Sequence, residues 1–220
     1  MVALVINDQA IHYSVLQRTS GTIKLIQYRN IMFNAQEIVD GRLFNVSFIQ
    51  HQLKKMSKQD RLSKPFAAFA LSGITQDLVE YVVACSEVPS SWEQLKDNRL
   101  LHDKVWIAHA LGYNHHTHKY YYYIFGLTRE LLFQYQLLSY QSNLNCILIT
   151  TASLSLLHTI FAQTSVANLV LAEHDYATVD DFIFDCMNQS SIAMITGNVI
   201  ERKHYLEALG LFRLGMYEYV

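Results

Sequence analysis

The stretch MVALVINDQAIHYSVL, residues 1–16, places two short apolar segments on either side of a polar turn. Residues 3–7 and 10–16 have the apolar and β-branched composition of strands, and residues 22–33 follow as a third strand. The turn between the first two, Asn7-Asp8-Gln9, contains no glycine. Glycines let a backbone approach a phosphate with its amide groups facing the anion. The opening therefore predicts a strand meander whose first turn is not built for a phosphate.

Composition bounds the class of protein. With 220 residues, 51% hydrophobic and 16% charged, the chain can form one sizeable domain or two small lobes. A net charge of −2 leaves no electrostatic footprint for nucleic acid or an anionic membrane. Three distant cysteines argue against both a disulfide framework and a zinc site. Because no apolar run approaches the ~20 residues of a membrane span and no signal peptide is visible, we expect no direct membrane insertion.

Strand and helix patterns alternate along the rest of the chain. Strands are expected at residues 66–71, 78–85, 104–111, 119–125, 145–150, 167–172, 179–186 and 192–196. Helices are expected at residues 46–56, 91–101, 128–142, 152–163 and 202–219. Asn45 is a candidate N-cap, and the matched strands around residues 112–118 predict a hairpin. The order is β-β-β-α-β, an inserted α+β segment, and β-α-β-β-β-α, which indicates a mixed α/β fold.

An ordered series of short phrases resembles the PilM family, the actin-like proteins of type IV pilus assembly, and its short relatives in competence and type II secretion systems. Each phrase is generic, and their order carries the resemblance. The phrases are LVI and IHYSVL at 4–6 and 11–16, IVDGRL at 38–43, FAAFALSG at 66–73, YYIFGLTREL at 122–131 and YLEALGLFRLG at 205–215.

This resemblance implies an actin-like or ribonuclease H-like fold in two lobes. The first lobe would span residues 1–144 with an α+β insert at about 74–127, and a truncated second lobe would span residues 145–220. Glu173-His174-Asp175-Tyr176 stands where the family has a glycine-bearing phosphate loop, and only residues 198–203 fill the interval of its adenine-binding glycines. ATP binding therefore carries over to no residue. We expect no catalytic, cofactor-binding or metal-binding residue and no cofactor.

Histidines gather near the predicted hairpin tip. His115, His116 and His118 lie there, with His109 and His102 nearby in sequence, and histidine is a common metal ligand. Neighbouring side chains on a short loop diverge, however, and the loop contains no acidic or cysteine partner. We interpret the group as a solvated tip, with metal binding as the alternative.

Acidic residues raise the alternative of a divalent-cation site like that of a ribonuclease H-like nuclease. Such a site needs carboxylates that converge from the first strand, a central strand and a late helix. The first strand offers only Asn7 and Asp8, and Asp8 fits a turn residue as well as a residual magnesium or phosphate contact. Asp180-Asp181 is typical of a turn between strands. The remaining acidic candidates are Asp175, Asp185, Glu207 and Glu218.

Other reactive side chains lack a supporting motif. Tyr120–Tyr123 favours a half-buried strand over a base-stacking surface, because tyrosine prefers sheets and few basic residues are near. Ser153, Ser155 and Cys146 lie in no nucleophile motif. No nucleic-acid partner is expected.

Two functions remain. The first is a non-catalytic cytoplasmic scaffold of a type IV pilus, competence or secretion machine. The resemblance implies its partner, a PilN-like bitopic protein of the inner membrane. That partner's N-terminal tail would dock between the first lobe and the insert and hold the scaffold at the membrane, with no groove residue assigned. The alternative is a residual ATP-binding protein or ATPase, or a metal-dependent nuclease of ribonuclease H-like topology. The sequence leaves open which machine is served and whether the chain self-associates.

Overall fold

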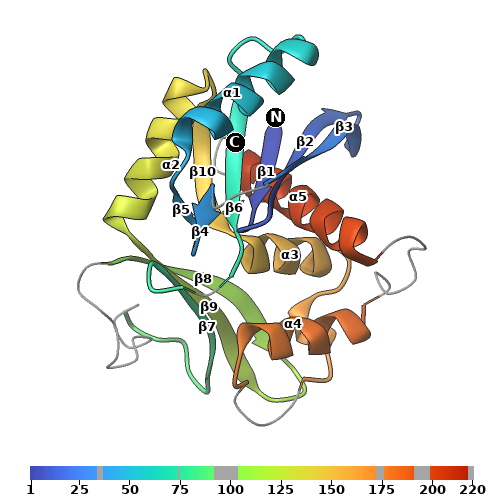
Figure 1. The fold of residues 1–220 in the computed structure, drawn as a ribbon. Helices are drawn as coiled ribbons and strands as arrows, with labels where there is room; N and C mark the ends of the chain where they lie inside the picture. Colours follow the sequence, from blue (N-terminus) through green and yellow to red (C-terminus); the bar gives the residue numbers. More distant parts are fainter. Residues whose placement is uncertain (34–36, 74, 92–103, 172–175, 191–198, 218–220) are drawn as a thin grey trace.

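The structure, a computed structural model, describes residues 1–33, 37–73, 75–91, 104–171, 176–190 and 199–217 (Figure 1). A five-stranded sheet has the order β10-β6-β1-β2-β3, and a three-stranded sheet has the order β7-β9-β8. The strands are β1 (Val2–Ile6), β2 (Ala10–Thr19), β3 (Thr22–Met32), β4 (Ile38–Val39), β5 (Arg42–Leu43), β6 (Phe66–Leu71), β7 (Leu78–Cys85), β8 (Lys104–Asn114), β9 (Lys119–Thr128) and β10 (Asn145–Thr151). The helices are α1 (Val46–Gln59), α2 (Arg129–Gln141), α3 (Ala152–Phe161), the 3₁₀ helix η2 (Val166–Asn168), α4 (Val179–Asn188) and α5 (Val199–Tyr217).

The opening of the chain confirms the predicted meander. β1, β2 and β3 pair antiparallel, and β6 joins the sheet beside β1 and runs parallel to it. Ser20 and Gly21 connect β2 to β3 with φ angles of 50° and 85°, and Asp40 and Gly41 connect β4 to β5 with 51° and 76°. Two consecutive positive φ angles are the backbone of a type I′ hairpin turn, which glycine and aspartate tolerate best.

Helices cover both faces of the large sheet (Figure 1). On one face, the ring of Phe69 on β6 packs against Tyr135 of α2, with 5.8 Å between ring centroids. The other face presents the small side chains Ala68 and Ala70 to Leu211 of α5. β1 is buried along its whole length, as expected for a central strand between two helical layers.

The two helices on the small-residue face touch closely. A Cβ atom added at Gly210 of α5 would stand 1.5 Å from the carbonyl oxygen of Ser155 on α3. The Thr159 hydroxyl donates to the Leu206 carbonyl at 2.6 Å between the same helices. Glycine is therefore required at residue 210 by close approach of backbones, and not by an unusual φ angle.

The insert between β6 and α2 folds as the predicted antiparallel hairpin with β7 added along β9. Its tip is anchored by Asn114, which is fully buried. The Asn114 amide nitrogen donates to the carbonyls of Val166 and Leu169 at 2.6 and 2.8 Å, and its oxygen accepts from the Thr117 amide at 2.9 Å. The distal end of the insert is therefore held against η2.

The sequence predicts that the strand at 145–150 opens a second lobe, and this prediction is wrong. β10 pairs in parallel with β6, Asn145 opposite Phe66, and forms one edge of the large sheet (Figure 1). No strand follows β10 among the residues that the structure describes. Parallel pairing joins segments that are distant in sequence, so local pattern carries little information about it.

Two further predictions fail after residue 165. Residues 179–186 form a helix, α4, instead of a strand, because Val179, Phe182 and Ile183 are buried at helical spacing. A short apolar run does not distinguish strand from helix. A strand was also expected at residues 167–172. Residues 167 and 168 belong instead to η2, and residues 169–171 form no strand. The expected strand at 192–196 and most of the expected helix at 91–101 lie outside the described residues.

Candidate functional site

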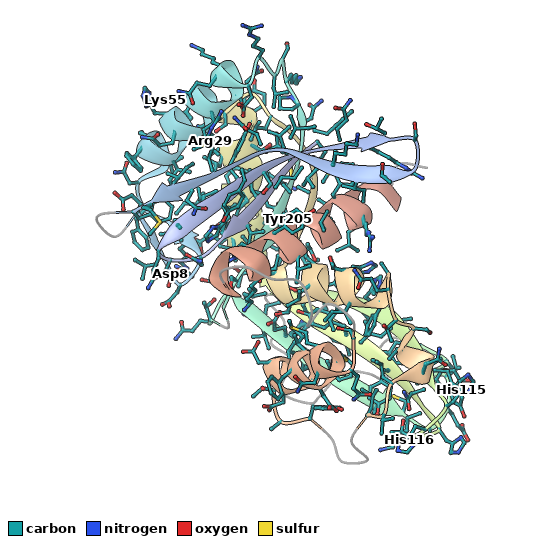
Figure 2. All side chains as sticks on the ribbon, turned by 90° about the vertical axis from the view of Figure 1, so that its right-hand side faces the viewer. Asp8, Arg29, Lys55, His115, His116 and Tyr205 are labelled. Carbon is teal, nitrogen blue, oxygen red and sulfur yellow. The ribbon has the colours of Figure 1, made fainter. Side chains whose placement is uncertain are left out.

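At the first turn, backbone amides donate hydrogen bonds to side chains of the chain itself. The Asn7 side-chain oxygen accepts from the amides of Gln9 and Ala10 at 2.9 and 2.8 Å. The Asp8 carboxylate accepts from the amides of Asp40 and Gly41 at 3.2 and 3.1 Å. Figure 2 labels Asp8 near the end of the sheet. The chain thus places its own carboxylate on amide groups of the kind that bind an external anion.

Where the insert leaves the large sheet, a charged contact fixes the junction. The Arg42 guanidinium donates to Asp77 through Nε, and through Nη2 at 3.0 Å, and the Thr128 hydroxyl donates to the same carboxylate at 3.0 Å. Hydrogen bonds from Arg42 hold the pKa of Asp77 below its usual value. Asp77 precedes β7 and Thr128 ends β9, so both connections of the insert meet at this point.

A second contact joins the insert to the start of α3. The Tyr123 hydroxyl donates to Glu80 and lies 2.5 Å from the Thr151 hydroxyl oxygen, and the Ser153 hydroxyl donates to Glu80 at 2.7 Å. Burial raises the pKa of Glu80 and also the pKa of Tyr123. Thr151 caps α3 by accepting from the Leu154 amide. Ser153 therefore serves the interface between β7, β9 and α3, with a carboxylate as its partner.

Histidine pairs form two contacts that the sequence analysis missed. His109 of β8 and His158 of α3 face each other with 2.8 Å between their Nε2 atoms. On the large sheet, His12 of β2 stacks on His204 of α5 with 3.5 Å between ring centroids. Burial is the main cause that lowers the pKa of both His158 and His12 to about 4, and the neighbouring histidine lowers each further. One feature of the sequence could have indicated such a pair: His12 lies in a strand of mainly apolar residues.

The predicted polar tip is solvent-exposed. His115, His116 and His118 are exposed, and Figure 2 shows the first two at the far end of the insert. His118 Nδ1 lies 3.1 Å from the Tyr113 hydroxyl. Across the described residues, no three histidine, cysteine or acidic side chains are grouped so as to hold a metal ion. His109 is drawn away to His158, and His102 lies outside the described residues.

The acidic candidates are not brought together in the described residues. Asp8 contacts the Asp40-Gly41 turn, and Asp181 forms a capping box with Thr178 at the start of α4, where a turn between strands is predicted. The Asp185 carboxylate accepts from the Tyr176 hydroxyl at 2.5 Å. Glu207 lies beside His204, with 2.9 Å between oxygen and Nδ1, at the α5 face of the large sheet. Asp175 and Glu218 lie outside the described residues.

One of the two edge strands of the insert sheet, β8, presents an apolar surface that the rest of the fold does not fully cover. Val105 and Ile107 of β8 stand opposite Leu127 and Phe125 of β9, so they share the face of the sheet on which those two residues are buried. Val105 and Ile107 nevertheless remain 36% and 43% exposed. β8 pairs only with β9 among the described strands. An edge strand beside exposed apolar side chains is a surface that can accept an extended peptide.

Comparisons with known proteins identify the fold. Neither a family profile nor a curated protein sequence matches the chain. A chain of the PilM-PilN type IV pilus biogenesis complex aligns with a TM-score of 0.57 at 10% identity, over 99% of this chain and 73% of that one. The cytoplasmic domain of EpsL, an inner membrane component of the Vibrio cholerae type II secretion system, gives 0.44 at 10% identity, over 70% and 56%. A Bacteroides thetaiotaomicron protein with an actin-like ATPase fold gives 0.40 at 9% identity, over 85% and 74%.

The first of these alignments spans nearly the whole chain. The protein therefore has a PilM-like, actin-like fold of the mixed α/β class, which confirms the fold class predicted from the sequence. No helix in the described part of the chain is long and apolar enough to cross a membrane.

Proposed function

We propose that this protein is a non-catalytic scaffold of a type IV pilus or related secretion or competence machine. In this proposal it binds the N-terminal tail of a PilN-like bitopic protein of the inner membrane. The observation that carries the proposal is the half-exposed apolar edge of β8 on a PilM-like fold. A partner with one membrane span would hold the scaffold at the cytoplasmic face of the membrane.

The first turn supports a non-catalytic role. An ATP site of this fold needs backbone amides that are free to meet phosphates. The amides of Gln9 and Ala10 are bound by Asn7, and those of Asp40 and Gly41 by Asp8. A nucleotide would have to displace these side chains before its phosphates could reach the amides.

The β8 edge supports tail binding by strand addition. An extended tail can pair its backbone with the edge strand while its apolar side chains cover Val105 and Ile107. The junction at Asp77 and the contact of Glu80 with Ser153 fix the insert against β5 and α3. The surface is therefore formed before the tail arrives. Ordering the tail still costs free energy, so we expect a dissociation constant in the micromolar range.

A peptide titration tests this docking surface. A synthetic peptide with the N-terminal sequence of the neighbouring bitopic membrane protein is expected to bind, with little dependence on salt. Val105→Asp combined with Ile107→Asp should abolish the binding seen by calorimetry. The matched control is Leu25→Asp with Ile26→Asp. These two exposed residues lie on β3, an edge strand of the large sheet. Binding that survives the β8 variant, or that the β3 variant also removes, contradicts the assigned surface.

Nucleotide addition separates the scaffold from the enzyme alternative. Saturation of an ATP site at ~100 times its dissociation constant would stabilise the folded state by about 2.7 kcal/mol. The scaffold proposal includes no ATP site, so millimolar ATP with magnesium is expected to leave the melting temperature unchanged. A clear increase would reject the non-catalytic scaffold and favour a residual ATPase.

Cell fractionation tests the membrane link. With the intact partner, the protein should sediment with membranes, and deletion of the partner's tail should release it into the soluble fraction. Retention on membranes without the tail would show that another contact holds it there.

A further inference from the structure

Basic residues lie close together where α1 ends and the chain returns to the large sheet at β6. Between residues 54 and 64 the sequence contains five lysine or arginine residues and one acidic residue, Asp60. The five basic residues are all exposed: Lys54, Lys55, Lys58, Arg61 and Lys64. Figure 2 shows Lys55 on α1, at the opposite end of the molecule from His115 and His116 at the tip of the insert. We call these five residues the basic surface.

The packing of α1 turns its lysines away from the core. Ile49, Leu53 and Met56 are buried on one side of the helix. At 3.6 residues per turn, Lys54, Lys55 and Lys58 project from the opposite side. Lysine carries its ammonium group on a flexible four-carbon stem, so charges on one helix side and in the following loop can reach a common plane.

The fold does not neutralise this positive charge. The Asp60 carboxylate accepts two hydrogen bonds from the Arg29 guanidinium, at 3.0 and 2.5 Å, so its charge is balanced by a sixth basic residue. No carboxylate in the described part of the chain forms an ion pair with a residue of the basic surface. Because five of the 17 basic residues lie here, the remaining 12 stand against 19 acidic residues. The net charge of −2 therefore hides one positive end and an acidic remainder.

Two exposed aromatic residues adjoin the basic surface. Phe66 follows Lys64 by two residues and is 55% exposed, and Tyr140 near the end of α2 is 83% exposed. Lys64 and Tyr140 line the same hollow, which has a volume of about 630 Å³. Aromatic rings beside lysines are typical of surfaces that meet a membrane, where the rings lie at the level of the headgroups and the ammonium groups meet lipid phosphates.

We propose that the basic surface is a contact for the anionic headgroups of a phospholipid membrane. Charge complementarity carries this proposal, because clusters of four to eight lysine or arginine residues on an amphipathic helix bind acidic lipids. The acidic remainder of the molecule is repelled by the same membrane, so the attraction also orients α1 toward the lipid. A nucleic acid fits less well. Its recognition favours arginine and a basic groove, whereas four of these five residues are lysines and three of them lie on the outer side of a helix.

The contact is weak by itself. Each basic residue near an anionic membrane contributes about fivefold to partitioning, so five residues give a constant on the order of 10³ M⁻¹. A single myristoyl chain reaches about 10⁴ M⁻¹ and binds only marginally. Physiological salt screens the charges further. The basic surface therefore adds to the proposed tail contact without replacing it, and deletion of the partner's tail still releases the protein in cells.

Co-sedimentation of the purified protein with vesicles tests the contact. At about 50 mM salt, the wild type is expected to sediment with vesicles of about 30% phosphatidylglycerol in phosphatidylcholine and to stay in solution with pure phosphatidylcholine. About 500 mM salt should release it. Lys54→Gln, Lys55→Gln and Lys58→Gln in one variant should weaken binding on the order of a hundredfold. Glutamine keeps the helix propensity, while three fivefold contributions are lost.

The matched control loses the same charge elsewhere. Arg18→Gln, Lys24→Gln and Arg129→Gln remove three exposed positive charges from β2, β3 and the start of α2, and this variant should bind anionic vesicles about as well as the wild type. Equal losses in the two variants, wild-type binding to neutral vesicles, or no wild-type binding to anionic vesicles overturns the proposal.

Competition distinguishes a membrane from other anionic partners. Anionic vesicles should displace an oligonucleotide or polyglutamate from the basic surface at about 50 mM salt, because the lipid also accommodates the neighbouring aromatic rings. Tighter binding to either polymer than to the vesicles would assign the surface to a nucleic acid or an acidic protein and would overturn the proposal. Neither assay contains the tail peptide, so the membrane contact and the proposed docking function can fail independently.

Discussion

The two sheets of this protein differ in how completely they are covered. β1 and most of β6 are buried between helices, and every residue of β1 is at most 2% exposed. The insert sheet has one covered face, and its edge strand β8 leaves Val105 and Ile107 half-exposed on that face. Burial of this extent makes the large sheet the main source of stability, while partial cover leaves the insert available for a partner.

The largest difference between the sheets should appear when apolar side chains are truncated. Phe69→Ala removes a fully buried ring from β6 and is expected to lower the free energy of unfolding by about 3–5 kcal/mol. Ile107→Ala, on the insert edge, should cost less than about 1 kcal/mol. Urea denaturation measures both. Equal losses would mean that the insert is as important to the folded state as the large sheet.

Two glycine substitutions sharpen the same comparison. At Gly210 the new methyl group would meet the backbone oxygen of Ser155, whereas at Gly126 it would stand 2.7 Å from ring atoms of Trp106. A side chain can move aside more easily than a helix backbone. We expect Gly210→Ala to cost about 3 kcal/mol, despite about 1 kcal/mol of gained helix propensity. Gly126→Ala should cost about 1 kcal/mol, and a reversed order of melting temperatures would contradict this packing.

Acidification should destabilise both regions through their histidine pairs. His12 and His158 have their pKa values lowered to about 4, so they are neutral in the folded protein above that pH. In the unfolded chain their pKa is about 6.5, so the unfolded state binds more protons between these values and stability falls as the pH drops through this window.

The measurement is the melting temperature from about pH 7 to about pH 5. It should decrease in the wild type, and carboxylates that titrate at lower pH contribute little above about pH 5. His158→Gln should flatten the profile by removing the contribution of the insert contact, and His12→Asn by removing that of the large sheet. A profile that neither variant changes would show that these pairs do not control acid stability.

The smallest effect is expected at the first turn. Asp8→Ala removes two hydrogen bonds from a solvent-exposed carboxylate and should cost about 0.5–1 kcal/mol. Asp8→Asn should cost less, because its amide oxygen can still accept one of the two bonds. Thermal unfolding in the two variants checks this order. A loss of several kcal/mol would show that the Asp40-Gly41 turn depends on Asp8 to fold.

Much of the first half of the fold follows from local pattern. The meander, α1 with its Asn45 cap, β6 and the insert hairpin were all predictable, because strand alternation, cap residues and the Asp40-Gly41 turn act over a few residues. The capping box of Thr178 and Asp181 was equally readable. It was missed because the apolar residues 182–184 between polar neighbours also fit a strand.

The candidate site was less predictable. The solvated histidine tip and the glycine-free first turn are properties of neighbouring residues, and the sequence indicates both. The role of Asp8 depends on amides more than thirty residues away, and the contact of Glu80 with Ser153 joins different sequence regions. Exposure of Val105 and Ile107 depends on how far α3 and the rest of the fold cover the insert. Composition alone does not contain that information.

By itself, then, the sequence determined a mixed α/β chain with an opening meander, an inserted hairpin and a first turn without glycine. Only the tertiary structure decided that β10 forms an edge of the large sheet, that histidines meet in pairs, and that α2 and β8 expose apolar side chains. The physical reason is range. Turns, caps and periodicity are interactions between residues close in the chain, whereas parallel strand pairing and burial result from packing between distant segments.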